Sequence, residues 1–208
     1  MSEKKKYSFK CLEQNCDNRV CCTRPHVYVT LGDLARWAAQ GYIEQIFPGL
    51  VINIPRAKEE AFTIETRRRQ FKRENDEEVD ACVFFRDDAN ACSIRYSRPL
   101  SCRTFPLLFD GNKFVLSDKA CPGLGKGEVT KEALKEAREL AEQEYRERLE
   151  TEAALPSVYG LIMGYMLKQS AEIVKNMSDE DRKKLEELMS RTPKREEDAS
   201  ETDNGDGT

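Results

Sequence analysis

Cys82-Val-Phe-Phe and Cys92-Ser-Ile-Arg-Tyr-Ser-Arg-Pro-Leu-Ser-Cys102-Arg-Thr-Phe-Pro form the stretch around which the chain is organised. Its three cysteines are spaced at intervals of ten residues, and short apolar runs typical of strands lie between them. A fourth cysteine, Cys121, follows before Pro122-Gly123. The stretch therefore predicts a small β-rich unit that carries four thiols.

The other four cysteines lie near the N-terminus, at Cys11, Cys16, Cys21 and Cys22, in a segment without helical or strand periodicity. Thiolate is a soft ligand, and an all-sulfur set selects Zn²⁺ or an iron–sulfur cluster. Adjacent side chains point in different directions, so Cys21 and Cys22 suit two ions, or two atoms of one cluster, better than one ion. Eight thiolates suffice for two four-sulfur sites, or for one cluster with thiolates to spare.

Two alternatives concern the same thiols. Disulfides are compatible with the even number of cysteines, but a reducing cytosol favours metal ligation. His26, the only histidine, is an alternative ligand or proton carrier, because sets of three cysteines and one histidine do bind zinc. With eight cysteines present, a metal site does not require it.

Two arginines flank the third cysteine of the central group. Arg98 and Arg103 lie on either side of Cys102, and cations beside thiolates lower the thiol pKa and offset the charge of a four-sulfur site. The simpler interpretation is that both arginines pair with surface carboxylates. Together with the adjacent cysteines, these arginines give a slight preference for iron–sulfur over zinc.

The composition restricts the partners. The chain has 208 residues, of which 39% are hydrophobic and 35% charged, which suits one domain with appendages. Segment 193–208 has two basic and six acidic residues, so it accounts for the whole net charge of −4. The charge therefore indicates neither nucleic acid nor an acidic ligand as a partner, and we interpret the basic run 67–73 as part of a solvated strand.

No membrane segment is expected. The N-terminal lysines are not followed by an apolar run, and the apolar-rich region 155–167 is shorter than the roughly 20 residues that a spanning helix needs. We expect a cytoplasmic protein.

Local patterns predict the elements around the cysteines. Thr30 and Asp33 have the spacing of a helix N-cap, and Asp110-Gly111-Asn112 is the strongest hairpin signal in the chain. Leu34, Trp37 and Ala38 are expected to form the inner face of the first helix. A second helix is expected from Thr130 to about residue 152, with this apolar stripe: Leu134, Ala137, Ala141, Tyr145 and Leu149.

Two further helices are expected, one from Pro156 to about Asn176 and one from the capping box at Ser178 and Asp181 to about residue 191. The predicted fold class is α+β. We expect a flexible N-terminus (1–10), a cysteine-cluster metal-binding domain with a small β core (11–127), a helical segment packing on it (128–191) and a disordered acidic tail (192–208).

The motif C-x-I-x-Y-x-R-P-x-x-C-R-x-F-P, read from Cys92, resembles the cysteine-cluster proteins named for a CxxCxxCC signature (YkgJ-like). The resemblance covers about residues 11–122 and includes Cys21-Cys22, Cys82 and Cys121. It implies zinc or iron chelation, and some members are described as Fe–S oxidoreductases. The N-terminal spacing here, C-x4-C-x4-C-C, is wider than the family name implies.

Together these observations predict a metal-binding protein that holds an iron–sulfur cluster or Zn²⁺ and takes part in electron transfer or metal handling. A metalloenzyme with an open metal position, either an oxidoreductase or an accessory to a modification enzyme, stays open as an alternative, as does a zinc-stapled interaction protein. Whether the chain is an enzyme is not decided by its residues. The expected metal ligands are all eight cysteines: Cys11, Cys16, Cys21, Cys22, Cys82, Cys92, Cys102 and Cys121.

Overall fold

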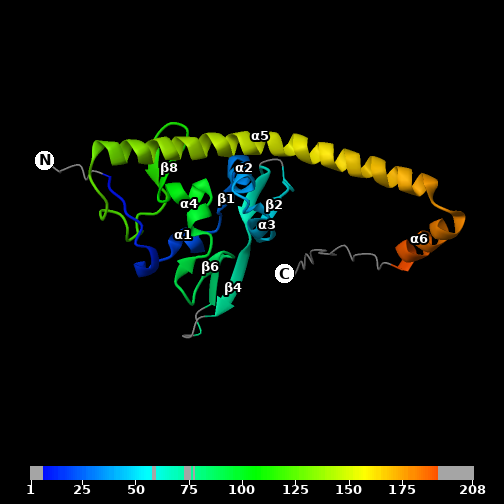
Figure 1. The fold of residues 1–208 in the computed structure, drawn as a ribbon, viewed down its shortest axis with the longest axis horizontal. Helices are drawn as coiled ribbons and strands as arrows, with labels where there is room; N and C mark the ends of the chain where they lie inside the picture. The colour runs from blue at the N-terminus through cyan, green and yellow to red at the C-terminus, as the bar shows by residue number, and fades with distance from the viewer. Residues whose placement is uncertain (1–6, 58–59, 73–75, 77, 192–208) are drawn as a thin grey trace, which may run out of the picture. The chain divides into compact units, whose positions relative to one another are not determined.

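The computed structural model describes residues 7–57, 60–72, 76 and 78–191 (Figure 1). It is 49% helical and 18% strand, which confirms the predicted α+β class. The chain divides into two compact units, Met1–Val158 and Tyr159–Thr208. The expected domain boundary at 127–128 stays a prediction. The acidic tail and residues 1–6 lie outside the described residues.

The described part of the first unit contains four small antiparallel sheets. One has three strands in the order β1-β3-β2, and the others pair β4 with β5, β6 with β7 and β8 with β9. The strands are β1 Tyr28–Val29, β2 Leu50–Asn53, β3 Thr63–Thr66, β4 Arg68–Lys72, β5 Glu78–Cys82, β6 Phe85–Arg86, β7 Ala91–Cys92, β8 Leu107–Phe109 and β9 Phe114–Leu116. The hairpin predicted around Gly111 connects β8 and β9, and the φ angle of Gly111 is 94°.

Short helices connect these strands: η1 Glu13–Asn15, α1 Val20–Thr23, α2 Leu31–Ala39, α3 Ile43–Ile46, η2 Phe47–Gly49, η3 Arg95–Ser97 and α4 Leu100–Thr104. Helix α2 begins with the predicted capping box, in which Asp33 N donates to Thr30 Oγ1 at 3.0 Å and Thr30 N donates to Asp33 Oδ2 at 3.2 Å. Trp37 is fully buried, as expected, whereas Ala38 is exposed, which corrects that part of the prediction.

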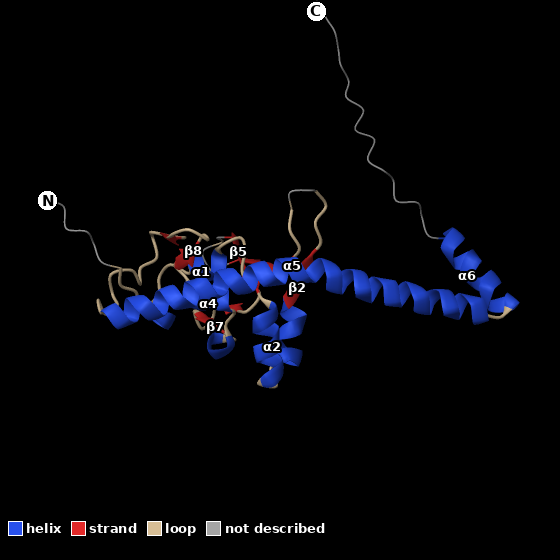
Figure 2. Cartoon of the chain, turned by 90° about the horizontal axis from the view of Figure 1, so that it is seen from above, coloured by secondary structure: helices blue, strands red, loops and turns tan. Residues whose placement is uncertain are grey.

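The main hydrophobic cluster joins helix α2, the three-stranded sheet and the first cysteine of the central group. Its buried members are Val29, Trp37, Ile46, Leu50, Ile64, Cys82, Phe84 and Leu155. Leu155 comes from the long helix α5, Lys131–Asn176. The first part of α5, up to residue 158, lies along one side of the first unit (Figures 1 and 2).

Helix α5 corrects two predictions. We expected a break before Pro156, but the helix continues through it for 46 residues in all. An internal proline costs about 3 kcal/mol, and the burial of neighbouring Leu155 in the main cluster helps to offset that cost. The predicted apolar stripe is also wrong at its end. Leu149 is 43% exposed, whereas the polar residues Glu144 and Thr151 are buried.

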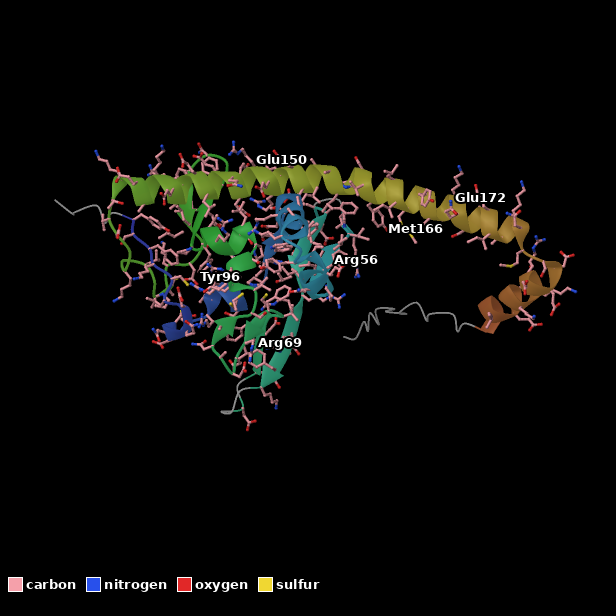
Figure 3. All side chains as sticks on the ribbon, in the orientation of Figure 1. Arg56, Arg69, Tyr96, Glu150, Met166 and Glu172 are labelled. Carbon is pink, nitrogen blue, oxygen red and sulfur yellow. The ribbon has the colours of Figure 1, made fainter. Side chains whose placement is uncertain are left out.

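The second unit consists of residues 159–176 of α5 and helix α6, Asp179–Arg191. The predicted N-cap is present, since Asp181 N donates to Ser178 Oγ at 3.2 Å, and Ser178 Oγ in turn donates to Asp181 Oδ2 at 2.7 Å. Figure 3 shows Met166 and Glu172 on this part of α5, and Met166 is 56% exposed. Among the described helices, none combines the length and the apolar character needed to cross a bilayer.

Candidate metal centre

The two groups of cysteines lie around two small cavities, here called cavity A and cavity B. Cavity A has a volume of about 40 Å³ and is lined by Cys11, Cys21, Cys22, Cys82, Cys92 and Cys102. Cavity B has a volume of about 60 Å³ and is lined by Cys11, Cys16, Cys21, Cys102 and Cys121. Each cavity is therefore lined by cysteines from both the N-terminal and the central group. Three of the eight cysteines, Cys11, Cys21 and Cys102, line both cavities.

Arg68 of β4 joins two of these cysteines through the backbone. In the β4–β5 ladder it lies opposite Cys82, and its guanidinium donates to the carbonyl oxygens of Cys22 and Thr23 at 3.2 and 3.0 Å. These carbonyls belong to the short helix α1. The basic run that we interpreted as a solvated strand therefore also anchors α1 against β5.

Helix α2 holds the turn that carries Cys102. Leu100 N donates to both carboxylate oxygens of Asp33, at 3.0 and 3.1 Å. The indole N–H of Trp37 donates to Ser97 O at 2.6 Å, on the other side of Pro99. Asp33 is only 2% exposed, and burial raises the pKa of its carboxyl although these backbone donors oppose the effect. The capping residue of α2 thus also positions α4.

The thiols differ in how easily they ionise. The sulfurs of Cys21 and Cys22 lie 3.8 Å apart. The hydrogen bond from Cys22, helped by nearby arginines, lowers the pKa of Cys21 to about 6, and the same contact together with burial raises the pKa of Cys22. The two thiols interact strongly enough to titrate as a pair. Burial raises the pKa of Cys102 to about 12.

Burial also raises the pKa of the other three shifted thiols, Cys16, Cys92 and Cys121. These thiols hold their protons at neutral pH. A metal ion that binds them must therefore displace those protons, since thiolate is the ligating form.

Buried arginines lie against the thiols. Arg19 is 8% exposed and lines both cavities; its Nε donates to Asn90 Oδ1 at 2.7 Å, while its buried Nη2 has no hydrogen-bond partner among the described residues. Arg24 Nη2 lies 3.5 Å from the sulfur of Cys102, and its buried Nε is likewise without a partner within the described ranges. Burying unpaired cations is costly, so these side chains favour negative charge in the cavities.

The two arginines selected from the sequence also lie here. Arg98 lines both cavities, and Arg103 lines cavity B. Sequence reasoning missed Arg19, Arg24 and Arg95, of which Arg95 lies 3.9 Å from the sulfur of Cys11. Each of the three stands within three positions of a cysteine, which is the signal that could have identified them.

Comparison with known families identifies the region that carries these cysteines. Residues 10–122 match the CxxCxxCC family, described as a "Putative zinc- or iron-chelating domain". The chain belongs to this family. The match covers both cysteine groups, and the description supports zinc or iron chelation without naming a further role. No curated protein and no solved structure matches the chain.

The family's chemistry can be tested against the donor atoms. All eight cysteines are free thiols. Within the described ranges, no three cysteine, histidine, aspartate or glutamate side chains converge closely enough to form a ready-made ion site. The soft donor set and the unpaired buried arginine nitrogens nevertheless fit an anionic metal–thiolate group. The sulfurs must move inward to bind one.

His26 lies elsewhere. Its side chain is 59% exposed, and its Nδ1 lies 3.0 Å from Glu65 Oε2. It lines neither cavity A nor cavity B. The structure therefore offers no contact that supports the alternative in which this histidine is a ligand.

Proposed function

We propose that this chain binds an iron–sulfur cluster or zinc through its cysteines and acts in electron transfer or metal handling in a reducing, cytoplasmic setting. The observation that carries the proposal is that thiols from residues 11–22 and 82–121 line the same two cavities beside a buried nitrogen of Arg19 that has no partner in the described part of the chain. The ligands we propose are Cys11, Cys16, Cys21, Cys22, Cys82, Cys92, Cys102 and Cys121.

The protein's residues would divide the work. The thiolates hold the metal, and burial of Cys82 keeps water from its sulfur. Arg19, Arg24 and Arg98 offset the charge of the thiolates. An iron–sulfur cluster supplies reversible one-electron chemistry at such a place, whereas zinc supplies none and only holds the chain together. The number of nearby cations makes iron–sulfur our first choice.

A zinc-stapled interaction protein is the second candidate, and one observation favours it. Cys82 is part of the main hydrophobic cluster with Trp37 and Phe84. A metal held by this thiol would be joined directly to the core. A structural zinc site contributes on the order of 10 kcal/mol to folding, which would matter for a unit built from such small sheets.

Elemental analysis and an absorption spectrum of the anaerobically purified full chain test the proposal. We expect a brown protein that contains iron and acid-labile sulfide and absorbs near roughly 400 nm. A colourless protein with stoichiometric zinc would select the second candidate. A folded protein without zinc or iron would contradict both.

A reversible potential decides the role of bound iron. We expect a dithionite-reduced sample to recover its oxidised spectrum on reoxidation. Iron that cannot be cycled in this way would argue against electron transfer and leave metal handling.

A further inference from the structure

We propose that the eight cysteines form two separate four-thiolate centres and that the adjacent Cys21 and Cys22 belong to different ones. This inference rests on the proposed function, because it divides the same ligands. Centre A consists of Cys22, Cys82, Cys92 and Cys102. Centre B consists of Cys11, Cys16, Cys21 and Cys121.

The backbone holds the members of centre A together. Arg68 joins Cys82 and Cys22. It lies opposite Cys82 in the β4–β5 ladder, and its guanidinium donates to the carbonyl oxygen of Cys22. Cys102 is joined to the end of α1 by Arg24, whose Nη2 lies 3.5 Å from its sulfur. Three of the four cysteines, Cys22, Cys82 and Cys92, line cavity A and not cavity B.

A second network holds the ends of centre B together. Lys10 N donates to Gly123 O at 3.1 Å, and Gly125 N donates to Ser8 O at 3.0 Å. This short pairing brings the segment before Cys11 beside the segment after Cys121, and both cysteines line cavity B. The two segments approach so closely that a Cβ on Gly123 would collide with the carbonyl oxygen of Lys10. Cys16 and Cys121 line cavity B and not cavity A.

Cys21 lines both cavities, so it stands at the junction. Centre A already has four thiolates without it, whereas the B set has only three. Four thiolates complete a tetrahedral zinc site or a cluster. Cys21 is therefore the fourth ligand of centre B, and its 3.8 Å contact with Cys22 is where the two centres meet.

Serine variants of the full chain test the division, with metal per chain measured after anaerobic purification. We expect Cys92→Ser and Cys121→Ser each to retain about half of the wild-type metal. The pair C22S/C92S, within one set, should also retain half, and so should C16S/C121S. The pair C92S/C121S, across the sets, should retain none.

The adjacent cysteines give the sharpest comparison. We expect C21S and C22S each to keep half of the metal and the double variant C21S/C22S to keep none. If the double variant still keeps half, both residues serve one centre and the division is wrong. If the wild-type protein contains metal but every single variant loses all of it, the division into two centres is wrong and the proposed function still stands. Wild-type protein without metal contradicts the proposed function itself.

The wild-type chain provides a test that does not depend on whether variants fold. Limited treatment with a chelator, followed by thiol alkylation and peptide mass mapping, reports which cysteines lose metal together. We expect alkylation in the two sets of four named above. Alkylation of all eight thiols at once, or in mixed sets, would overturn the proposal.

Discussion

Cavity A and cavity B share three cysteines, yet their remaining walls are built differently. Cys22, Cys82 and Cys92 of cavity A lie on α1, β5 and β7, and Cys82 packs in the main hydrophobic cluster. Cys16 and Cys121 of cavity B lie in loops. The difference indicates that sheet ladders and core packing position the thiols of cavity A, whereas hydrogen bonds between loops position those of cavity B.

Metal removal should expose this difference most strongly. On chelation, we expect the free energy of unfolding to fall by several kcal/mol, up to about 10, because a structural thiolate centre supplies that much. Amide hydrogen exchange should then rise first in residues 8–16 and 121–127 and later in β5 and β7. Equal loss of protection around both cavities would break the comparison, and unchanged stability would contradict a metal that supports the fold.

Asp33→Ala is the next largest expected effect, because this residue holds the turn that carries a thiol shared by both cavities. The variant leaves the N–H groups of Leu100 and Thr30 without their acceptor, which we expect to cost about 2–4 kcal/mol. Urea denaturation followed by the fluorescence of Trp37, the only tryptophan, measures it. The exposed Glu136→Ala is the matched control and should change stability by less than about 0.5 kcal/mol.

Two serine substitutions compare the walls in the absence of metal. Cys82→Ser places a hydroxyl in the hydrophobic cluster, and we expect this to cost about 1–3 kcal/mol. Cys121→Ser changes a half-buried loop thiol and should cost less than about 0.5 kcal/mol. Urea midpoints with excess chelator and reductant give both values. A larger cost for Cys121→Ser than for Cys82→Ser would contradict our inference that core packing positions the thiols of cavity A more firmly than loop hydrogen bonds position those of cavity B.

Metal affinity should also depend on pH. Centre A contains three thiols with raised pKa, Cys22, Cys92 and Cys102, so metal binding displaces their protons. Affinity therefore rises as pH rises from 6 to 8, by about 1.4 kcal/mol per pH unit for each proton released. Centre B contains two such thiols, Cys16 and Cys121, whereas its Cys21 has a lowered pKa of about 6 and releases little above that pH. Zinc competition titrations should thus show a steeper pH dependence for C121S, which keeps centre A, than for C92S.

Local chemistry explains what sequence reasoning predicted well. The capping box at Thr30, the N-cap at Ser178 and the hairpin at Gly111 formed as expected. In each of these, the partners lie within a few positions of one another, so spacing and residue type are sufficient.

The errors occurred where distant partners decide the outcome. Thr151 is buried on α5 because it accepts a hydrogen bond from Leu31 N at 2.9 Å, and Glu147 accepts one from Thr30 Oγ1 at 2.7 Å. An apolar stripe drawn through Leu149 cannot anticipate a polar face that packs on the start of α2. The same packing, with Leu155 in the core, carries the helix through Pro156.

The sequence by itself determined that eight thiols are available, that they fall in two groups, and that the chain belongs to a zinc- or iron-chelating family, because residue types and spacings carry that information. Only the tertiary structure decided which thiols line a common cavity, that Arg19 is buried among them and that Arg24 reaches the sulfur of Cys102. These contacts join residues 60 or more positions apart, and such neighbours are selected by the packing of α1, β5 and α4 rather than by any local pattern.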